Sequence, residues 1–113
     1  MGFFLKDQIE FKQVDGNTKR KVLAHDHNLM MVEIHFAEPT EEADLVLHSH
    51  PHEQMTYVLQ GKLKFFMDDK THVVQAGDSL YFPSHVMHGC VVLEPDTRLL
   101  DVFTPIREDF LEQ

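Results

Sequence analysis

The residues most suited to chemistry in this sequence are histidines, and they gather near the middle of the chain. The stretch "HSHPHEQMTYVLQG", residues 48–61, places three histidines on alternate positions and follows them with an acid and an amide. A further histidine, His88, ends the stretch "GDSLYFPSHVMH", residues 77–88. Imidazole nitrogens together with a side-chain oxygen bind divalent transition metals. The pattern therefore indicates one such ion, with Zn, Ni, Mn, Fe and Co all open.

Short apolar runs must form the elements that position these side chains. Runs of β-branched and aromatic residues recur along the chain, separated by turn signals such as "DG", "MDDK", "AGD" and "EPDT". Many short strands at even spacing indicate an all-β sandwich or barrel. Helical periodicity is confined to "REDFLEQ" near the C-terminus, where we expect at most a short helical turn.

Alternation within "LVLHSH" predicts which way the first histidines point. Successive side chains of a strand point to opposite faces. His48 and His50 then project from the same side as Val46, about 7 Å apart along the strand, so that both rings can reach one ion. The letters "PHE" predict a corner, after which Gln54 and Thr56 continue on the same face.

The stretch "LLDVFTP" carries a carboxylate between apolar residues. Leu99, Asp101 and Phe103 share one face of the predicted strand. A buried carboxylate without a partner is costly. Asp101 therefore acts either in the chemistry of the site or as the structural partner of an arginine, for which Arg98 and Arg107 are the candidates.

The two histidine-containing stretches resemble the two motifs of the cupin superfamily. Residues 48–61 match the first motif, a His-x-His pair with an acid or amide four residues on and a later glycine, and residues 77–88 match the second. The resemblance implies one cupin domain over residues 1–113, an all-β double-stranded β-helix or jelly-roll barrel. It also implies a divalent metal held by three histidines and an amide: His48, His50, Gln54 and His88.

Four positions depart from the usual motifs. Gln54 replaces the common glutamate, so the set of ligands is neutral and leaves the ion its full positive charge, which suits an anionic substrate. Glu42 replaces a glycine that often precedes the first histidine, and His85 and Val92 replace a glycine and an asparagine in the second motif. None of these changes removes a proposed ligand.

Within the superfamily, residues 19–111 resemble the KdgF family, the pectin-degradation cupins. The similar segments include "KRKVLAHDHNLMMVEIHF" and "LLDVFTPIREDFL". Members of that family convert 4,5-unsaturated monouronates, released from pectin or alginate by lyases, to the linear keto form. The resemblance implies that Asp101 is the catalytic acid and base, that Phe103 lines the substrate pocket and that Arg107 contacts the substrate. It further implies an isomerase-like enzyme that acts on an anionic sugar, and a homodimer.

Composition excludes several other partners. Ten basic and nineteen acidic side chains give a net charge of -9, which argues against nucleic acid and anionic membrane. The single cysteine, Cys90, excludes an internal disulfide. The start "MGFFLKDQIEF" is not a secretory signal peptide, and no apolar run is long enough to span a bilayer, so we expect a cytoplasmic protein.

Two other functions fit the same motifs, because cupins host many unrelated activities. The first is a different metal-dependent cupin enzyme, an oxygenase or decarboxylase that acts on a small acid with a redox metal. The second is a non-enzymatic metal- or sugar-binding module, in which Asp101 has no clear role.

The other histidines are interpreted separately. We assign His25, His27 and His72 to the surface. His35 alternates with Glu33 and is an equally good candidate for a barrel-lining group. His52 and Glu53 are candidate substitute ligands, although their place in the corner favours roles outside the metal's own ligands.

Overall fold

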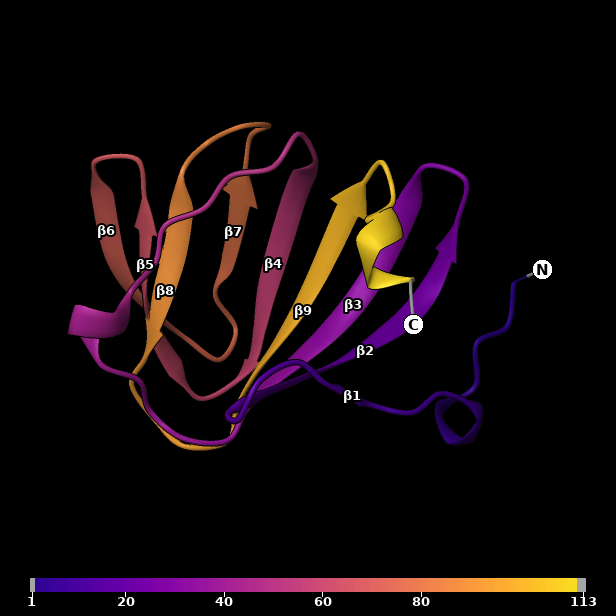
Figure 1. Ribbon diagram of the computed structural model, residues 1–113, viewed down its shortest axis with the longest axis horizontal. Coiled ribbons are helices and arrows are strands. Elements are labelled where there is room, and N and C mark those ends of the chain that lie inside the picture. Colours follow the sequence, from indigo (N-terminus) through magenta and orange to yellow (C-terminus); the bar gives the residue numbers. More distant parts are fainter. Residues whose placement is uncertain (1, 112–113) are drawn as a thin grey trace.

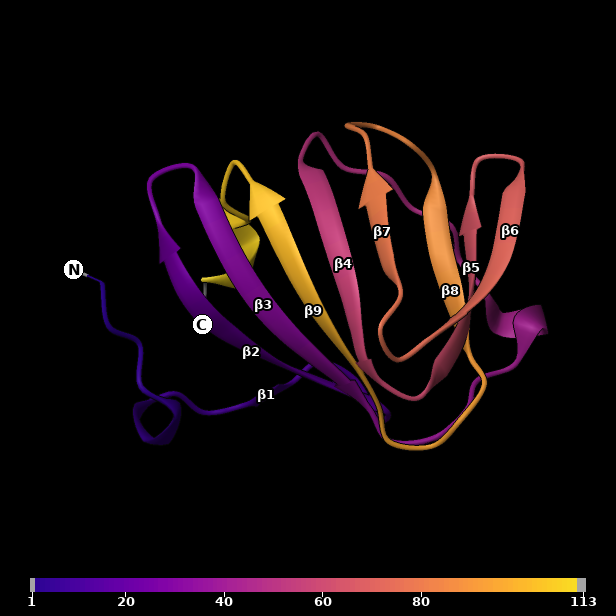
Figure 2. The same ribbon diagram turned by 180° about the vertical axis from the view of Figure 1, so that it is seen from behind.

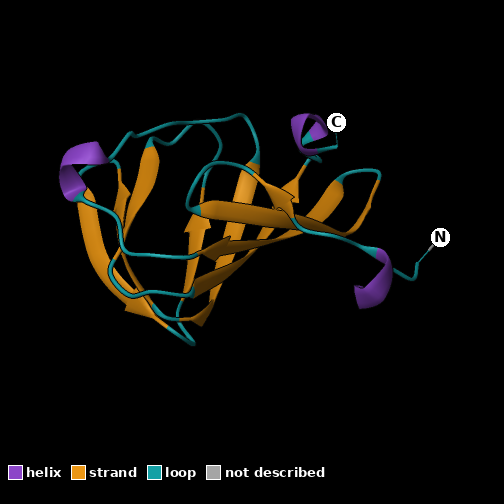
Figure 3. Ribbon diagram, turned by 60° about the horizontal axis from the view of Figure 1, so that its bottom comes forward, coloured by secondary structure: helices purple, strands orange, loops and turns teal. Residues whose placement is uncertain are grey.

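The computed structural model describes residues 2–111, and strands dominate it (Figure 1). The strands are β1 (Lys12–Gln13), β2 (Thr18–Asp26), β3 (Leu29–Phe36), β4 (Glu53–Gln60), β5 (Lys62–Met67), β6 (Lys70–Gln75), β7 (Ser79–Phe82), β8 (His88–Val92) and β9 (Thr97–Thr104). The helical elements of the described residues are short 3-10 turns (Figure 3), η1 (Lys6–Gln8), η2 (Glu42–Asp44) and η3 (Glu108–Phe110). The predicted all-β fold with a short C-terminal turn is confirmed. No helix in this part of the chain is long and apolar enough to cross a membrane.

The strands form two antiparallel sheets. The larger has six strands in the order β1-β2-β3-β9-β4-β7, and the smaller has three in the order β6-β5-β8. Views from the two sides show β9 between β3 and β4 (Figures 1 and 2). The last strand of the chain thus lies inside the larger sheet, as in the predicted jelly roll, and joins segments that are far apart in the sequence.

Apolar side chains of both sheets form the core. The larger cluster joins the two sheets and comprises Val58, Leu63, Phe65, Val74, Phe82, Val92 and Leu99. A smaller cluster of Met30, Val32 and Phe103 lies on the larger sheet. Along β9, Leu99, Asp101 and Phe103 are all buried and their neighbours are half-buried. The predicted shared face of these three residues is confirmed, and it places a carboxylate in the interior.

The corner between β4 and β5 depends on Gly61. Its φ of +87° lies in the left-handed region that favours glycine. A Cβ atom at this position would lie 2.1 Å from Thr97 Oγ1 and 2.8 Å from Thr97 Cα. A larger residue therefore requires β9 to move. This corner carries the chain from the larger sheet to the smaller one, and so fixes how the cavity between them closes.

The stretch before β4 differs from the prediction. Instead of a strand through "LVLHSH", His48 forms an isolated bridge with His88, through backbone hydrogen bonds of 2.9 and 2.8 Å. Val46 is 76% exposed and does not share a buried face with His50. The His50 carbonyl accepts the His85 N–H at 2.7 Å at the approach to the corner, so the chain leaves the ladder before β4 begins.

Candidate metal centre and active site

One cavity of about 220 Å³ collects the residues that the sequence singles out. Its walls come from β3, β4 and β9 of the larger sheet and from β5 and β8 of the smaller. The proposed ligands and substrate contacts that border it are His48, His50, Gln54, His88, Asp101, Phe103 and Arg107. The structure therefore brings all seven together, although they come from separate parts of the chain. Apolar side chains such as Ile34, Phe36 and Phe65 complete the lining.

The three histidine rings approach one another in this cavity. The ring centroids of His48 and His88 lie 4.5 Å apart, those of His50 and His88 4.9 Å, and those of His48 and His50 6.3 Å. His50 and His88 are buried. Burial lowers the pKa of both imidazoles, and the charge of Arg107 lowers it further. Both rings are thus neutral at pH 7, the form that offers a lone pair to a metal.

Backbone carbonyls determine which nitrogen of each buried ring faces the cavity. His50 Nδ1 lies 3.1 Å from the His52 carbonyl oxygen, and His88 Nδ1 lies 2.9 Å from the Val86 carbonyl oxygen. Because a carbonyl only accepts, these hydrogen bonds assign the proton of each neutral ring to Nδ1. The Nε2 lone pairs are then free. Metal-binding histidines are commonly oriented by such a bond from the other ring nitrogen.

Gln54, Thr56 and Asp101 form a chain of buried hydrogen bonds. Gln54 Nε2 donates to Thr56 Oγ1 at 2.9 Å, and the Thr56 hydroxyl donates to Asp101 Oδ1 at 2.6 Å. Gln54 and Thr56 lie on the buried face of β4, and Asp101 is the register partner of Thr56 on β9. These bonds leave Gln54 Oε1 facing His50 Nε2 at 3.1 Å.

This last contact is where a metal ion fits. With the His50 proton on Nδ1, an imidazole lone pair meets an amide oxygen across 3.1 Å. The two acceptors need a cation between them, and the lowered pKa of His50 disfavours a proton in that role. Two ligand atoms that each lie about 2.1 Å from one ion are about 3 Å apart. The spacing of the two atoms therefore suits a shared divalent ion.

The side chains do not yet surround such an ion. Among residues 2–111, no three His, Cys, Asp or Glu side chains stand in a metal-binding arrangement. Gln54 is not one of these residue types, and His50 Nε2 is turned towards its amide. His50, Gln54 and His88 fit a divalent ion by their chemistry, burial and hydrogen bonds, and the exposed His48 borders the same cavity.

The Asp101 carboxyl is buried, with 8% of the residue exposed. Burial raises its pKa to about 6, while hydrogen bonding by Thr56 and Gln54 and the charge of Arg107 lower it. A carboxyl with a pKa near neutral pH can both take and return a proton, as a general acid and base must. Its position in the same cavity as the histidines makes it the strongest candidate for proton transfer.

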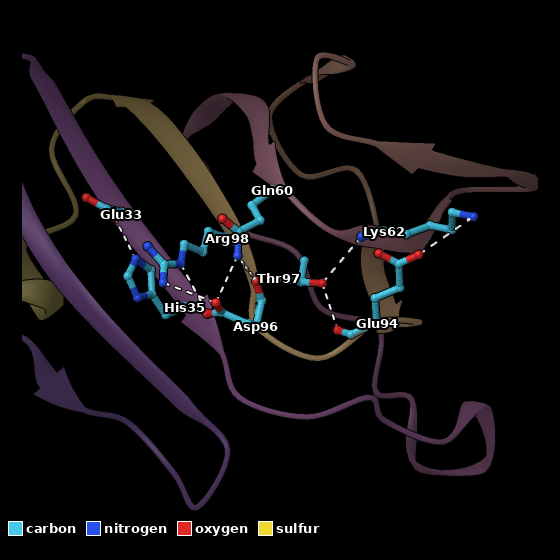
Figure 4. Close-up of polar contacts among 8 residues, drawn as sticks. All are labelled: Glu33, His35, Gln60, Lys62, Glu94, Asp96, Thr97 and Arg98. Carbon is cyan, nitrogen blue, oxygen red and sulfur yellow. Dashed lines mark hydrogen bonds and ion pairs between the residues drawn. The ribbon is translucent and has the colours of Figure 1, made fainter.

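The arginines considered as structural partners of Asp101 pair with other carboxylates. Arg98 binds Asp96, with 3.1 Å between Nε and Oδ1 (Figure 4). Arg107 binds Asp109, with 3.1 Å between Nη2 and Oδ2. The Asp101 carboxylate instead accepts a hydrogen bond from the Thr56 hydroxyl.

Aromatic rings hold Arg107 at the edge of the cavity. Its guanidinium carbon lies 4.3 Å from the Phe110 ring centroid and 5.3 Å from that of Phe103. Phe103 also presents its ring to His50, with 5.9 Å between the centroids. Stacking on two rings and the bidentate pair of Nε and Nη2 with Asp109 limit the motion of the guanidinium. The remaining donors, those of Nη1 among them, are left for a substrate carboxylate.

His35 lies on the opposite face of β3 from the cavity. Its Nε2 lies 2.5 Å from Glu33 Oε2, and its ring packs against Phe11, with 4.4 Å between centroids. Figure 4 shows His35 beside the Arg98–Asp96 pair. The strand turns Ile34, not His35, towards the cavity. This decides the open choice for His35 against a barrel-lining role.

The other histidines and Glu53 also lie outside the cavity. His52 Nε2 donates to the Ile106 carbonyl at 3.2 Å, and the Glu53 carboxylate accepts a hydrogen bond from the Tyr81 hydroxyl. Neither is placed as a substitute ligand. His27 and His72 are exposed, as predicted, whereas His25 is half-buried and stacks on Phe4.

Two residues of the cavity region carry no distinct signal in the sequence. Alternation predicts that Thr56 faces inward, but its partner Asp101 comes from a strand 45 residues later. Cys90 borders the cavity itself, whereas Thr56 lies behind Gln54 and Asp101. Burial raises the pKa of its thiol to about 12, so that the side chain is an uncharged wall and not a nucleophile.

A larger groove of about 420 Å³ lies elsewhere, beside the N-terminal arm and the β2–β3 hairpin. Its lining is mostly apolar, with His25 and Asp26 as its titratable groups. It lacks a converging set of donors. The smaller cavity is therefore the better candidate for catalysis.

Comparisons with known proteins agree with this fold. The Cupin domain family matches residues 34–103. The pectin degradation protein KdgF of Dickeya dadantii is 32% identical over 110 residues, which cover 96% of this chain and 97% of that protein.

Solved structures show the same likeness. KdgF from Halomonas sp. is 34% identical with a TM-score of 0.86, over 96% of this chain and 98% of that one. An RmlC-like cupin from Shewanella frigidimarina is 38% identical with a TM-score of 0.85, over 96% and 94% of the two chains. Oxalate decarboxylase of Bacillus subtilis, which has Mn(II) centres, is 21% identical with a TM-score of 0.78, over 96% and 31%, and shares the fold alone.

Proposed function

This chain belongs to the cupin family and, within it, to the KdgF family, and we propose that it linearises 4,5-unsaturated monouronates with the help of a divalent metal. The substrates are the sugars that lyases release from pectin or alginate, and the product is the linear keto acid. The observation that carries the proposal is one cavity in which three histidines and an amide stand beside a buried carboxyl of pKa about 6 and a guanidinium held by aromatic rings.

The reaction needs one group that moves a proton between two sites of the sugar. The ring is a cyclic enol ether beside a carboxylate, and a hemiacetal carbon closes it. Asp101 takes the hydroxyl proton of the hemiacetal, the bond between C1 and the ring oxygen breaks, and an aldehyde forms at C1 with an enolate at C5. Asp101 then returns the proton to C4, which leaves a ketone at C5. The proton count balances within the active site, without any external acid or base.

The remaining groups bind and orient the anionic sugar. Arg107 is fixed by two aromatic rings and pairs with the sugar carboxylate in a charge-assisted contact. Phe103 provides an apolar wall between the histidines and Arg107. A divalent ion held by His48, His50, Gln54 and His88 supplies Lewis-acid stabilisation of negative charge on substrate oxygens. The positive charge of Arg107 and the ion offsets the net charge of -9 on the chain, which otherwise repels an anionic substrate.

The test is direct turnover. The chain, loaded in turn with Zn²⁺, Ni²⁺, Mn²⁺, Fe²⁺ or Co²⁺, is incubated with freshly prepared unsaturated monouronate. Loss of the ultraviolet absorbance of the conjugated double bond reports ring opening. A blank without protein is essential because these sugars also open on their own. Rates equal to the blank with every metal would exclude the proposed reaction.

We also propose that the chain forms a homodimer through the outer face of the larger sheet. Met55, Tyr57 and Leu59 alternate along β4 and are 60%, 46% and 42% exposed. Tyr81, the register partner of Met55 on β7, is 47% exposed. A row of large apolar side chains on one sheet face is typical of a protein interface, and a second copy of the same face is the simplest partner.

A further inference from the structure

The orientation of the Gln54 amide depends on a neighbour that neither contacts the cavity nor carries a charge. Thr56 is 1% exposed and lies between Gln54 and Asp101 in the buried hydrogen-bond chain. Its hydroxyl has one proton and can accept further hydrogen bonds. The donor and the acceptor of each hydrogen bond among these three residues therefore follow from whether the next group can donate or only accept.

The direction is set at the Asp101 end. An ionised carboxylate only accepts, so the single Thr56 proton goes to Asp101 Oδ1, at 2.6 Å. The same hydroxyl is then left as an acceptor towards Gln54. The group that satisfies it is the amide –NH2, and Gln54 Nε2 is indeed the atom placed 2.9 Å away. The amide oxygen consequently faces His50 Nε2, at 3.1 Å.

An amide turned by 180° would lose both of these contacts of Gln54, the one with Thr56 and the one with His50. Its oxygen would face a hydroxyl that has no proton left to give, and its –NH2 would point at the ion position. A cation is repelled by the –NH2 group and attracted by the oxygen. Gln54 thus needs an external constraint to act as a ligand, because its own side chain has no preference between the two orientations.

We propose that Thr56 is a positioning residue for the metal site, because its hydroxyl holds the Gln54 oxygen towards the histidines while its proton goes to Asp101. The inference rests on the proposed function only in treating this cavity as a metal site. It concerns the affinity for the ion, which is measured without any sugar. Its outcome is therefore independent of which substrate the chain acts on.

The competing explanation is that Thr56 simply fills the core. Thr56→Val keeps the shape and removes the hydroxyl, and Thr56→Ser keeps the hydroxyl and removes a methyl group. Zn²⁺ affinity is measured for both variants by competition with a chromophoric chelator, after thermal melts of the metal-free proteins establish that each is folded. We expect Thr56→Val to bind Zn²⁺ about 10- to 100-fold more weakly, and Thr56→Ser to restore most of the affinity. Equal affinity of the parent and Thr56→Val would overturn the proposal.

A double-mutant cycle separates positioning from general damage to the site. If Thr56 acts through Gln54, then Thr56→Val has no further effect on Zn²⁺ affinity in a Gln54→Ala background. An equal loss in both backgrounds contradicts the proposed route. Should Thr56→Val fail to fold, a crystal structure of the Zn²⁺-loaded parent decides the matter. A Gln54 amide beyond hydrogen-bonding distance of the Thr56 hydroxyl in that structure also overturns the proposal.

The two proposals fail in different ways. Suppose that the parent and Thr56→Ser bind Zn²⁺ more tightly than Thr56→Val, but that the parent opens no uronate. The proposed reaction is then refuted, and the proposed role of Thr56 stands. If the parent opens uronates and Thr56→Val retains parental Zn²⁺ affinity, the proposed reaction stands and the proposed role of Thr56 is refuted.

Discussion

Thr56 and Asp101 face each other on adjacent strands, and the Thr56 hydroxyl lies 2.6 Å from Asp101 Oδ1. This bond fixes one oxygen of a carboxyl that is otherwise surrounded by the interior. The carboxyl borders the cavity, where its pKa of about 6 suits proton exchange with a substrate. The relationship makes Asp101 the first residue to test.

Asp101→Asn should reduce turnover by about 100-fold or more, because an amide cannot carry the proton. The Asn side chain is nearly isosteric and can still accept the Thr56 hydrogen bond, so fold and metal content should be preserved. Uronate affinity should change much less than turnover, since Arg107 and the metal remain. Absorbance kinetics with the spontaneous rate subtracted, together with metal analysis, measure both effects. A folded, metal-loaded Asp101→Asn variant as fast as the parent would assign Asp101 a structural role.

The rate should depend on pH through the same carboxyl. The first step needs the ionised form, whose fraction rises as pH increases through the pKa of about 6. The value of kcat/KM should therefore rise between about pH 5 and 7. A divalent cation in the same cavity lowers this pKa, so the midpoint of the metal-loaded enzyme should lie at pH 6 or below.

Loss of metal in acid must be separated from this effect, because protons compete for the histidines. Metal content is therefore measured at each pH. A rate that falls with rising pH over this range, at constant metal content, contradicts the assignment of Asp101 as the base.

Removing a histidine of the cavity should strip the metal. His48→Ala and His88→Ala each delete one of the three proposed imidazole ligands, so both should lower metal content and the melting temperature of the loaded protein. His72→Ala is the matched control, because His72 is exposed on β6. Melting of the metal-free proteins serves to subtract purely structural effects. A double variant of His48 and His88 that retains full occupancy would place the ligands elsewhere.

The sequence predicts the part of the site that local pattern determines. Alternation in β9 correctly turns Asp101 inward, and the two histidine stretches lead to one cavity. It fails where long-range contacts decide. His48 leaves the expected strand because it pairs with His88. The position of His35, which the sequence leaves open, is decided by its contacts with Glu33 and Phe11.

Two further contacts of the site cannot be predicted from the sequence, because they join residues that are far apart in the chain. The hydrogen bond from Thr56 to Asp101 requires the register of β4 against β9. The position of Phe110 beside the cavity also involves Arg20 of β2, whose guanidinium carbon lies 3.9 Å from the Phe110 ring centroid. Neither is encoded by the spacing of residues along the chain, so each depends on tertiary structure.

The apolar outer face of the larger sheet should control the oligomeric state. Tyr57→Glu places a charge in the middle of that face, and a buried unpaired charge opposes association. The parent should elute as a dimer in size-exclusion chromatography with light scattering, and Tyr57→Glu as a monomer. Lys70→Glu, a charge change on the edge strand β6 of the smaller sheet, is the control. A parent that is monomeric at high concentration contradicts the proposed homodimer.

Gln54→Glu tests the value of a neutral set of ligands. A carboxylate is a good metal ligand, so the variant should keep the ion. The added negative charge reduces the effective charge of the ion and repels an anionic sugar, so uronate binding should weaken. The glutamate cannot donate to Thr56 as the Gln54 –NH2 does at 2.9 Å. It also brings a second negative charge towards Asp101, which raises the pKa of Asp101 further.

Gln54→Glu should therefore change two measured quantities. Its affinity for the uronate should be weaker, and the acidic limb of its kcat/KM profile should shift to higher pH. Both are measured on protein of verified metal content, beside Gln54→Ala as the variant that removes the ligand without adding charge. Gln54→Ala should lose metal affinity. It adds no carboxylate, so it does not raise the pKa of Asp101 by repulsion between two negative charges. Tighter uronate binding by Gln54→Glu, at equal metal content, would show that the neutral amide is not what suits the site to an anion.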